Sequence, residues 1–375
     1  MVIAVNTRVW LDSAHEDYGN FIKEVFSHIV AQHGEHRFYF LFDRPVPATV
    51  TLPPGVTPVV VGPPARHPLL WKYWYDVAVP RTLKKIGADV LVSPDGFASL
   101  TTKVPQCLVV HDFSFLHFTE GYPKSHLQFY KFFTPRFLKK AATIATVSQF
   151  LKKEMVAQYK IPPEKISVVY SAATEVFKPL PWEAHAAVKE AYTEGKEYFI
   201  YTGAIHPRKN LLNLLKAFSK FKKWQRSGFK LVLAGRMDWK NNEFLELLKT
   251  YKYRGDVVLL ADVGEEALAQ LVGAAYALVH PSFYEGFGTP VLEAIQCEVP
   301  VLTSAEGAMQ EIAGEAALYF NPHDVDDMAQ QLMTIYKDEN KRSQLIQKGK
   351  AAKKGYSWQT TADALWQSIQ AAAKG

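Results

Sequence analysis

Cysteine is scarce in this 375-residue chain. Its two cysteines, Cys107 and Cys297, are too few for a disulfide scaffold or a multi-cysteine metal site, and both stand in apolar contexts typical of a core. No apolar run reaches the roughly eighteen residues that a membrane-spanning helix needs. The opening residues MVIAVNTRVW show no basic leader and no cleavage site, so we expect a first strand rather than a signal peptide, and a cytoplasmic protein.

Several motifs of common enzyme classes are missing as well. The sequence has no Gly-x-x-x-x-Gly-Lys-Ser/Thr loop, no Gly-x-Gly-x-x-Gly after the first strand, no His-Glu-x-x-His and no Gly-x-Ser-x-Gly. Neither a P-loop nucleotidase nor a standard dinucleotide enzyme is therefore supported. No Asp-x-Asp stands where it could hold a metal on a diphosphate. A bound diphosphate would have to be neutralised by basic side chains and helix ends.

The composition is that of a globular protein, with 48% hydrophobic and 21% charged residues and a mean hydropathy of −0.10. The length is comfortable for two domains. The net charge of +6 lies entirely in residues 1–180, which hold 20 basic and 14 acidic residues, whereas residues 181–375 hold 23 of each.

Residues 121–160 concentrate the excess charge, with eight basic residues and one acidic residue. They also hold eight aromatic residues, among them Phe129, Tyr130, Phe132, Phe133 and Phe137. Such interleaving suits an anionic membrane surface or an anionic substrate. It also fits a core helix whose lysines keep it soluble. Nucleic acid is a weaker alternative, because the second half is neutral, and we expect no nucleic-acid partner.

Short apolar, β-branched runs predict strands, and helical patterns follow many of them. The predicted strands lie near 2–5, 38–42, 56–61, 89–92, 106–110, 143–147 and 166–169, then near 198–201, 229–233, 256–260, 276–279, 300–303 and 317–320. This alternation predicts an α/β protein with two doubly wound, Rossmann-like domains built on parallel sheets. Such domains bind ligands at the carboxyl ends of their strands, so we expect a central cleft there. The Pro-containing stretch from Lys178 to about Gly195 is the predicted connection.

The segment Tyr201–Asn210, YTGAIHPRKN, lies between a predicted strand and a helix that starts near Leu211. Asn210 is a favourable N-cap residue. Arg208 and Lys209 add two full charges to the partial positive charge of the helix N-terminus, which indicates an anion site suited to a diphosphate. A solvated basic loop that merely precedes a helix is the alternative.

The segment His280–Ala294, HPSFYEGFGTPVLEA, follows the predicted strand at 276–279. Gly286 and Gly288 allow the backbone to approach a ligand closely, and Thr289 before a proline predicts an N-cap. Glu285 then lies in the loop and Glu293 about one turn into the helix. Carboxylates in these places can accept hydrogen bonds from sugar hydroxyls. Alternatively, Glu293 interacts only with the helix dipole and Glu285 is solvated.

Two weaker candidates lie in the first half. His111, with Asp112, directly follows the strand at 106–110, where it could contact or polarise a substrate, or act only as a structural side chain. Gly19 stands in a predicted loop before the helix near Phe21–Val30, where its backbone could meet a phosphate.

These segments resemble glycosyltransferase family 4. The resemblance rests on Glu285 and Glu293 with seven residues between them, on TGAIHPRKN, on Thr146-Val-Ser148, and on Tyr356-Ser-Trp358. It implies the GT-B fold, with an acceptor-binding domain at 1–180 and a nucleotide-sugar domain at 181–355. The helix at 356–375 would return to the N-terminal domain.

The resemblance also implies site residues. Arg208 and Lys209 would hold the donor diphosphate, Glu285 the transferred sugar and Glu293 the ribose, while His111 would face the donor sugar. The donor-binding residues implied are Gly19, Gly203, Arg208, Lys209, Val263, Glu285, Gly286, Phe287, Gly288, Thr289 and Glu293. Some members carry an arginine where this chain has Ala204, which would place more of the anion binding on Arg208.

The implied activity is metal-independent, retaining transfer of a hexose, needing no cofactor. The donor would be a UDP- or GDP-sugar, and the acceptor a glycan or lipid-linked glycan. The product would be an α-linkage in a cell-surface polysaccharide such as lipopolysaccharide, made at the inner membrane face. Another GT-B enzyme, such as an epimerase or a phosphorylase, and a non-catalytic sugar-nucleotide-binding module remain as alternatives.

Overall fold

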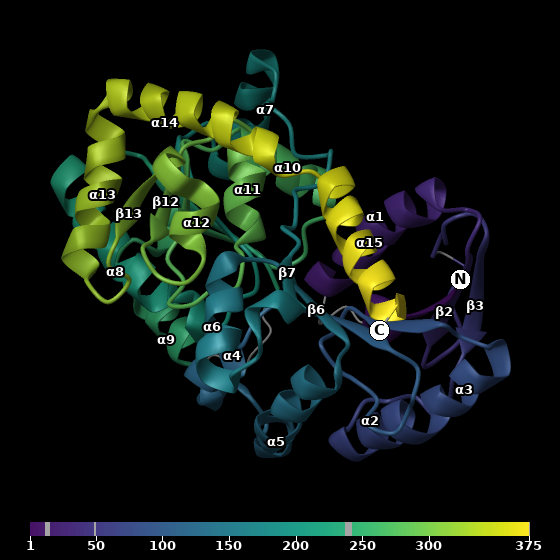
Figure 1. The fold of residues 1–375 in the computed structure, drawn as a ribbon. Helices are drawn as coiled ribbons and strands as arrows, with labels where there is room; N and C mark the ends of the chain where they lie inside the picture. Colours follow the sequence, from purple (N-terminus) through teal and green to yellow (C-terminus); the bar gives the residue numbers. More distant parts are fainter. Residues whose placement is uncertain (12–15, 49, 237–241, 375) are drawn as a thin grey trace. The chain divides into compact units, whose positions relative to one another are not determined.

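The computed structural model describes residues 1–11, 16–48, 50–236 and 242–374. The chain divides into two compact units (Figure 1), which we call the first unit (Met1–Ser171 with Ser357–Gly375) and the second unit (Ala172–Tyr356). This division falls shortly before the Pro-containing stretch that the sequence indicates as the connection. The helix α7 (Trp182–Thr193), which begins within that stretch, is already part of the second unit.

The first unit is built on a parallel sheet, which has seven strands among the described residues, in the order β3-β2-β1-β4-β5-β6-β7. Every residue of β1 and β5 is buried, and their sequences VIAVN and QCLVV are nearly continuous apolar runs. That pattern is typical of strands with both faces covered. The strands are β1 (Val2–Asn6), β2 (Arg37–Phe42), β3 (Val56–Val60), β4 (Val90–Ser93), β5 (Gln106–Val110), β6 (Thr143–Thr146) and β7 (Ile166–Val168).

The helices of the first unit include the last helix of the chain, α15 (Trp358–Lys374), which packs against α1 (Glu16–Gln32) and strands β4 to β7. The Oγ1 of Thr143 in β6 donates a hydrogen bond to the carbonyl of Ser368. The ring of Trp366 stacks on that of His33, with 3.9 Å between the ring centres. The last helix is thus an integral layer of this unit. The other helices are α2 (Pro68–Tyr73), a π-helix at Trp74–Ala78, α3 (Val79–Ile86), α4 (Ser114–His117), α5 (Lys124–Lys140) and α6 (Gln149–Tyr159).

The second unit repeats the plan, with six described parallel strands in the order β10-β9-β8-β11-β12-β13. The strands are β8 (Tyr198–Thr202), β9 (Lys230–Ala234), β10 (Val257–Leu260), β11 (Ala277–His280), β12 (Val301–Ser304) and β13 (Ala317–Phe320). Besides α7, its helices are α8 (Leu211–Gln225), α9 (Asn242–Thr250), α10 (Glu265–Gly273), α11 (Thr289–Gln296), α12 (Met309–Ala313), α13 (Val325–Lys337) and α14 (Glu339–Ala352). The α/β fold with two doubly wound units is therefore confirmed, as are all the predicted strands.

The aromatic residues between 121 and 160 differ in how far they are buried. Phe129 and Phe137 are buried in α5, whereas Phe132 is 53% exposed. Cys107 and Cys297 are also buried and are not disulfide-bonded, which confirms the expected apolar setting. The interpretation of the 121–160 aromatics as core residues thus holds for Phe129 and Phe137, whereas five of the eight are half-buried, and the lysines of α5 are exposed.

The strand order gives each sheet a switch point, where the chain reverses the direction in which it adds strands. It lies between β1 and β4 in the first unit and between β8 and β11 in the second. Open α/β sheets bind ligands outside the carboxyl ends of strands at such points. The loops that follow these four strands are therefore where we look for function.

Candidate active site

Glu285, in the loop between β11 and α11, is the centre of a buried ion cluster in the second unit. One of its carboxylate oxygens accepts a hydrogen bond from Lys209 Nζ at 2.6 Å, and the other accepts one from an Arg208 guanidinium nitrogen at 2.9 Å. Both cations follow β8 in a short 3₁₀ turn, Pro207–Lys209. The cluster therefore spans the switch point and joins residues that are far apart in the sequence.

His280, the last residue of β11, completes the cluster. Its Nε2 lies 3.2 Å from the Glu285 carboxylate, and its side chain is fully buried. Burial lowers the pKa of His280, partly offset by Glu285. The imidazole is therefore neutral at neutral pH, with Nε2–H as the donor to Glu285. Among the described atoms, His280 Nδ1 has no hydrogen-bond partner.

The ionisation of Glu285 follows from its surroundings. Burial alone would raise the pKa of this carboxyl group, but the charges of Lys209 and Arg208 outweigh burial and hold the pKa well below its usual value. The cluster thus contains two cations and one carboxylate at neutral pH. Its net positive charge favours an incoming anion.

The backbone holds Glu285 from the opposite side. Gly307, at φ +66°, lies so close that a Cβ at this position would come within 2.6 Å of the Glu285 carbonyl oxygen and 2.8 Å of its nitrogen. The next residue, Ala308, donates its N–H to that same carbonyl at 3.0 Å. Arg208 also binds the backbone of this loop, because its guanidinium donates a hydrogen bond to the carbonyl of Tyr284 at 2.8 Å. The Glu285 loop is therefore held by contacts from the segments that follow β8 and β12.

Of the two predicted helix caps, one is confirmed in position and one is wrong. Asn210 is the N-cap residue of α8, but its backbone is left-handed (φ 61°) and its side chain makes no capping hydrogen bond. Its amide donates instead to the carbonyls of Pro281 and Pro322. Thr289 is already the first residue of α11, and Gly288 at φ 98° is its N-cap. Only glycine reaches that backbone conformation without strain, and a Cβ there would also meet the side chain of Met309.

The other donor-site candidates of the second unit also lie at the carboxyl ends of its strands or just beyond them. Gly203 follows β8, Val263 follows β10, and Gly286 and Phe287 share the Glu285 loop. Glu293 lies half-buried in the second turn of α11. The structure thus gathers these residues on one edge of one sheet, as the sequence indicates.

His111 and Gly19 belong to the first unit and are described with it. Burial lowers the pKa of His111 to about 4, and its Nε2 lies 3.0 Å from the carbonyl oxygen of Pro94. The His111 ring also packs against Tyr18 and Phe21. Gly19 lies in the first turn of α1 and not in a loop, with its α-carbon packed beside the backbone of Trp10. The sequence places the start of this helix too late.

The sequence alone does not single out Gly307, His280 or Gly235. Gly235 follows β9 and lies against Gly203, where a Cβ would come within 1.9 Å of the Gly203 carbonyl oxygen. Only the folded chain brings Gly307 to Glu285 and Gly235 to Gly203, because the two residues of each pair follow different strands, whereas His280 and Glu285 are five positions apart. Gly307 in particular gives no signal, because a single glycine after a strand is common.

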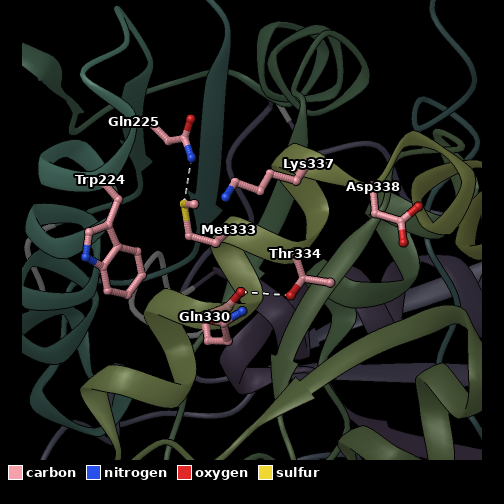
Figure 2. Close-up of a pocket in the computed structure, with 7 residues that line it drawn as sticks. All are labelled: Trp224, Gln225, Gln330, Met333, Thr334, Lys337 and Asp338. Carbon is pink, nitrogen blue, oxygen red and sulfur yellow. Dashed lines mark hydrogen bonds between the residues drawn. The ribbon is translucent and has the colours of Figure 1, made fainter.

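A surface pocket of about 470 Å³ is lined mainly by residues of α8 and α13 (Figure 2). Its residues come from the ends of α8 and α13 and the start of the following helix: Trp224, Gln225, Gln330, Met333, Thr334, Lys337 and Asp338. It holds none of the predicted site residues. We therefore base the site on the Glu285 cluster and not on this pocket.

Comparison with known proteins identifies the class. The model of "Glycosyltransferase Family 4" matches residues 19–173, and that of "Glycosyl transferases group 1" matches residues 185–352. The O-antigen chain mannosyltransferase B of Escherichia coli is 31% identical over 250 residues, which are 66% of this chain and 66% of that protein. The chain belongs to the group 1 glycosyltransferases of family 4. The match covers just under two thirds of this relative's length.

Solved structures agree on the fold. WaaG, a glycosyltransferase involved in lipopolysaccharide biosynthesis, superimposes with a TM-score of 0.77 at 16% identity, covering 98% of this chain and 99% of that one. HepE from Anabaena, solved in complex with UDP-glucose, gives a TM-score of 0.74 at 16% identity and covers 99% of each chain. The chain has the GT-B fold. Within the described residues, no helix is long and apolar enough to cross a membrane.

A first prediction concerns Gly307. Replacing it with alanine should lower the free energy of unfolding of the second unit by about 1–3 kcal/mol, because the added methyl group meets the Glu285 backbone and the positive φ is strained. Urea denaturation would measure this. Gly255→Ala is the control, since its Cβ would meet nothing within 4 Å. Equal stability of the two variants would contradict the close packing described above.

A second prediction concerns pH. Since the folded-state pKa of Glu285 lies below its unfolded value of roughly 4.3, its ionic contribution to stability is fully present above that pH and is lost as the pH falls through the folded pKa. Glu285→Gln should therefore lower the free energy of unfolding by about 3 kcal/mol at neutral pH and by less at acidic pH. Urea denaturation across pH would measure the difference. Glu246→Gln, at an exposed ion pair with Lys249, should cost little at any pH. If the loss of stability caused by Glu285→Gln did not change with pH, this would be evidence against an ionised, ion-paired Glu285 in the folded protein.

Proposed function

We propose that this protein transfers a hexose from a nucleotide-diphosphate sugar to a glycan or lipid-linked glycan during cell-surface polysaccharide synthesis. The proposal rests above all on the Glu285 cluster, in which two cations converge on one buried carboxylate at the switch point of the second sheet. That arrangement offers positive charge for a diphosphate and a fixed acceptor for hydroxyl groups. Membership of the group 1 glycosyltransferases agrees with it.

The cluster suggests how the donor is bound. A diphosphate carries more negative charge than Glu285 does, so it competes for Arg208 and Lys209 when it arrives. The carboxylate oxygens released from these cations then accept hydrogen bonds from the hydroxyls of the transferred sugar, while His280 and the Gly307 backbone keep Glu285 in place. Gly286, Phe287 and Gly288 add backbone N–H groups, and Glu293 accepts hydrogen bonds from the ribose.

The chemistry follows from charge. As the glycosidic bond breaks, negative charge grows on the leaving diphosphate, where Lys209 and Arg208 stabilise it. The acceptor hydroxyl attacks on the face from which the diphosphate departs, and a departing phosphate oxygen takes its proton. The anomeric configuration is retained and an α-linkage results. No protein side chain is required as general base, and His111, neutral at physiological pH, contributes by contacting the donor sugar.

We propose mannose as the transferred sugar. The relative from Escherichia coli is an O-antigen chain mannosyltransferase, and Glu285 can bind the hydroxyls of a mannosyl group. HepE binds UDP-glucose, so both UDP- and GDP-linked sugars belong in the test. O-antigen chains are glycans, which supports a glycan acceptor here.

A third prediction tests the function. GDP-mannose, UDP-glucose and the corresponding free diphosphates should be screened by thermal shift, and the one that binds used in a transfer assay. Lys209→Ala should lower kcat by roughly 10²–10³, because one positive charge is lost where the leaving group becomes charged. Lys216→Ala, at an exposed position of α8, is the control. Nucleotide sugars that neither bind nor react, or a fully active Lys209→Ala, would refute the proposal.

We also propose that α2 and α5 of the first unit dock on an anionic membrane. The two helices are in contact, and both present large apolar side chains to solvent: Leu69 is 76% exposed and Phe132 is 53% exposed. Basic side chains accompany them, with Lys72 over the Phe133 ring and Arg136 over the Phe132 ring. Apolar tips surrounded by positive charge are typical of surfaces that bind the membrane interface.

A fourth prediction follows. The protein should float with vesicles of phosphatidylcholine and phosphatidylglycerol but not with phosphatidylcholine alone. The double variant Lys139→Ala with Lys140→Ala should bind roughly thirtyfold less, since each basic residue near the surface contributes about 1 kcal/mol. Trp224→Ser, at an exposed aromatic residue of the second unit, should bind normally. Equal binding to both kinds of vesicle would contradict docking by charge.

A further inference from the structure

The surface pocket of the second unit (Figure 2) lies toward the opposite edge of the sheet from the Glu285 cluster. Helices α8 and α13 begin after the carboxyl ends of β8 and β13 and run back toward the amino ends of the strands. Tyr276, directly before β11, accordingly donates its hydroxyl hydrogen to the carbonyl of Ile335, near the end of α13, at 3.3 Å. Trp224, near the end of the 15-residue α8, lies about 20 Å along the helix axis from Leu211. The pocket is therefore separate from the site proposed for the nucleotide sugar.

An exposed aromatic ring forms one side of this pocket. Trp224 is 47% exposed, although a large aromatic side chain contributes most to stability when it is buried. Met333 is buried in α13, and its Sδ accepts a hydrogen bond from Gln225 Nε2 at 3.0 Å. Figure 2 shows Met333 between the Trp224 ring on one side and Lys337 on the other. The pocket thus combines an open aromatic face with a held apolar side chain.

Hydrogen-bond donors and acceptors line the rest of the pocket. The amide of Gln330 and the ammonium group of Lys337 can both donate. The Thr334 hydroxyl donates to the carbonyl of Gln330 at 2.9 Å, so its oxygen remains able to accept. Asp338 caps α14, because its Oδ1 accepts a hydrogen bond from the N–H of Lys341 at 2.8 Å, and its second carboxylate oxygen can accept from a ligand. A ligand with several hydroxyl groups would find partners of both kinds.

Charge and polarity narrow the choice of ligand. The lining residues carry one positive charge, on Lys337, and one negative charge, on Asp338. Helices α8 and α13 both end here, and the partial negative charge of a helix C-terminus disfavours a phosphate. A wholly apolar ligand would cover the polar groups without replacing their hydrogen bonds to water. The pocket therefore suits a neutral ligand that has one apolar face and many hydroxyl groups, which is the chemistry of a sugar ring.

We propose that this pocket is a non-catalytic binding site for a neutral saccharide. The C–H face of a sugar ring stacks on Trp224, its hydroxyls donate to Asp338 and Thr334, and they accept from Lys337 and Gln330. The volume of about 470 Å³ lies in the range of about 300–1,000 Å³ that is usual for small-molecule pockets. The saccharide is a unit of the acceptor glycan remote from the reacting end. That identification rests on the proposed function, whereas the binding of a saccharide does not.

The fifth prediction is tested by fluorine NMR on the full-length protein labelled with fluorotryptophan. Maltotriose or a mannose disaccharide should shift the Trp224 resonance in a saturable way, because the sugar ring covers the indole, and inorganic phosphate should not. The Trp224→Phe variant assigns this resonance by its loss. Trp182, which is 80% exposed at the start of α7, supplies the control resonance and should not move.

Two carboxylate variants test the hydrogen bonds. Asp338→Asn should weaken saccharide binding roughly tenfold, because a charged acceptor becomes neutral, whereas asparagine still caps the helix. Asp326→Asn is the matched control, since Asp326 is an exposed carboxylate at the other end of α13 and is paired with Lys220. It should leave saccharide binding unchanged.

Several results would refute the site. Neither saccharide shifts the Trp224 resonance at the limit of its solubility, phosphate shifts it as far, the Trp182 resonance moves equally, or the two carboxylate variants weaken binding alike.

The transfer assay separates this site from the proposed function. Asp338→Asn should raise the KM for a long glycan acceptor and leave both kcat and the KM for a short glycoside unchanged, because a short acceptor cannot reach a pocket about 20 Å along α8. Equal effects on long and short acceptors would overturn the link to the acceptor glycan. Saccharide binding at Trp224 without any transfer from a nucleotide sugar would overturn the proposed function and leave the site standing.

Discussion

The attraction between Glu285 and the two cations that follow β8 is the interaction on which the second unit's chemistry depends. It joins residues more than seventy positions apart in the chain, and it keeps a carboxylate ionised where burial would otherwise favour its neutral form. The same contact keeps Arg208 and Lys209 in place before any ligand arrives. A site arranged in advance spends less of its binding energy on ordering side chains.

The two units share one sheet architecture but differ in the sign of the charge near their switch points. Both place charged residues after the first strand and after the strand that begins the second half of the sheet. Near the switch point of the second unit Arg208 and Lys209 outnumber Glu285, whereas near that of the first unit Asp95 and Asp112 outnumber Arg8. A shared fold therefore does not fix the ligand, because the sign of the local charge is set by a few loop residues.

The sequence predicts the strands well because each is a short apolar run, such as VIAVN in β1, that only a covered parallel strand explains. The Arg208, Lys209 and Glu285 assignments could be made because those residues stand in recognisable segments. The position of the Asn210 cap could be predicted, but not that its side chain bonds to two distant carbonyls in place of the helix end. At α11, Gly288 takes the cap position predicted for Thr289. Arg8 stands in no motif, and only the sheet order brings it to Asp95.

The position of α15 bears on how the chain reaches its native state. The first unit is discontinuous, since it needs residues from the far end of the polypeptide to cover one face of its sheet, whereas the second unit is a single uninterrupted stretch. During synthesis the second unit can close before the first, although it emerges later. The sheet of the first unit has apolar surface uncovered until α15 has been synthesised and has packed on it, and apolar surface exposed in this way favours aggregation.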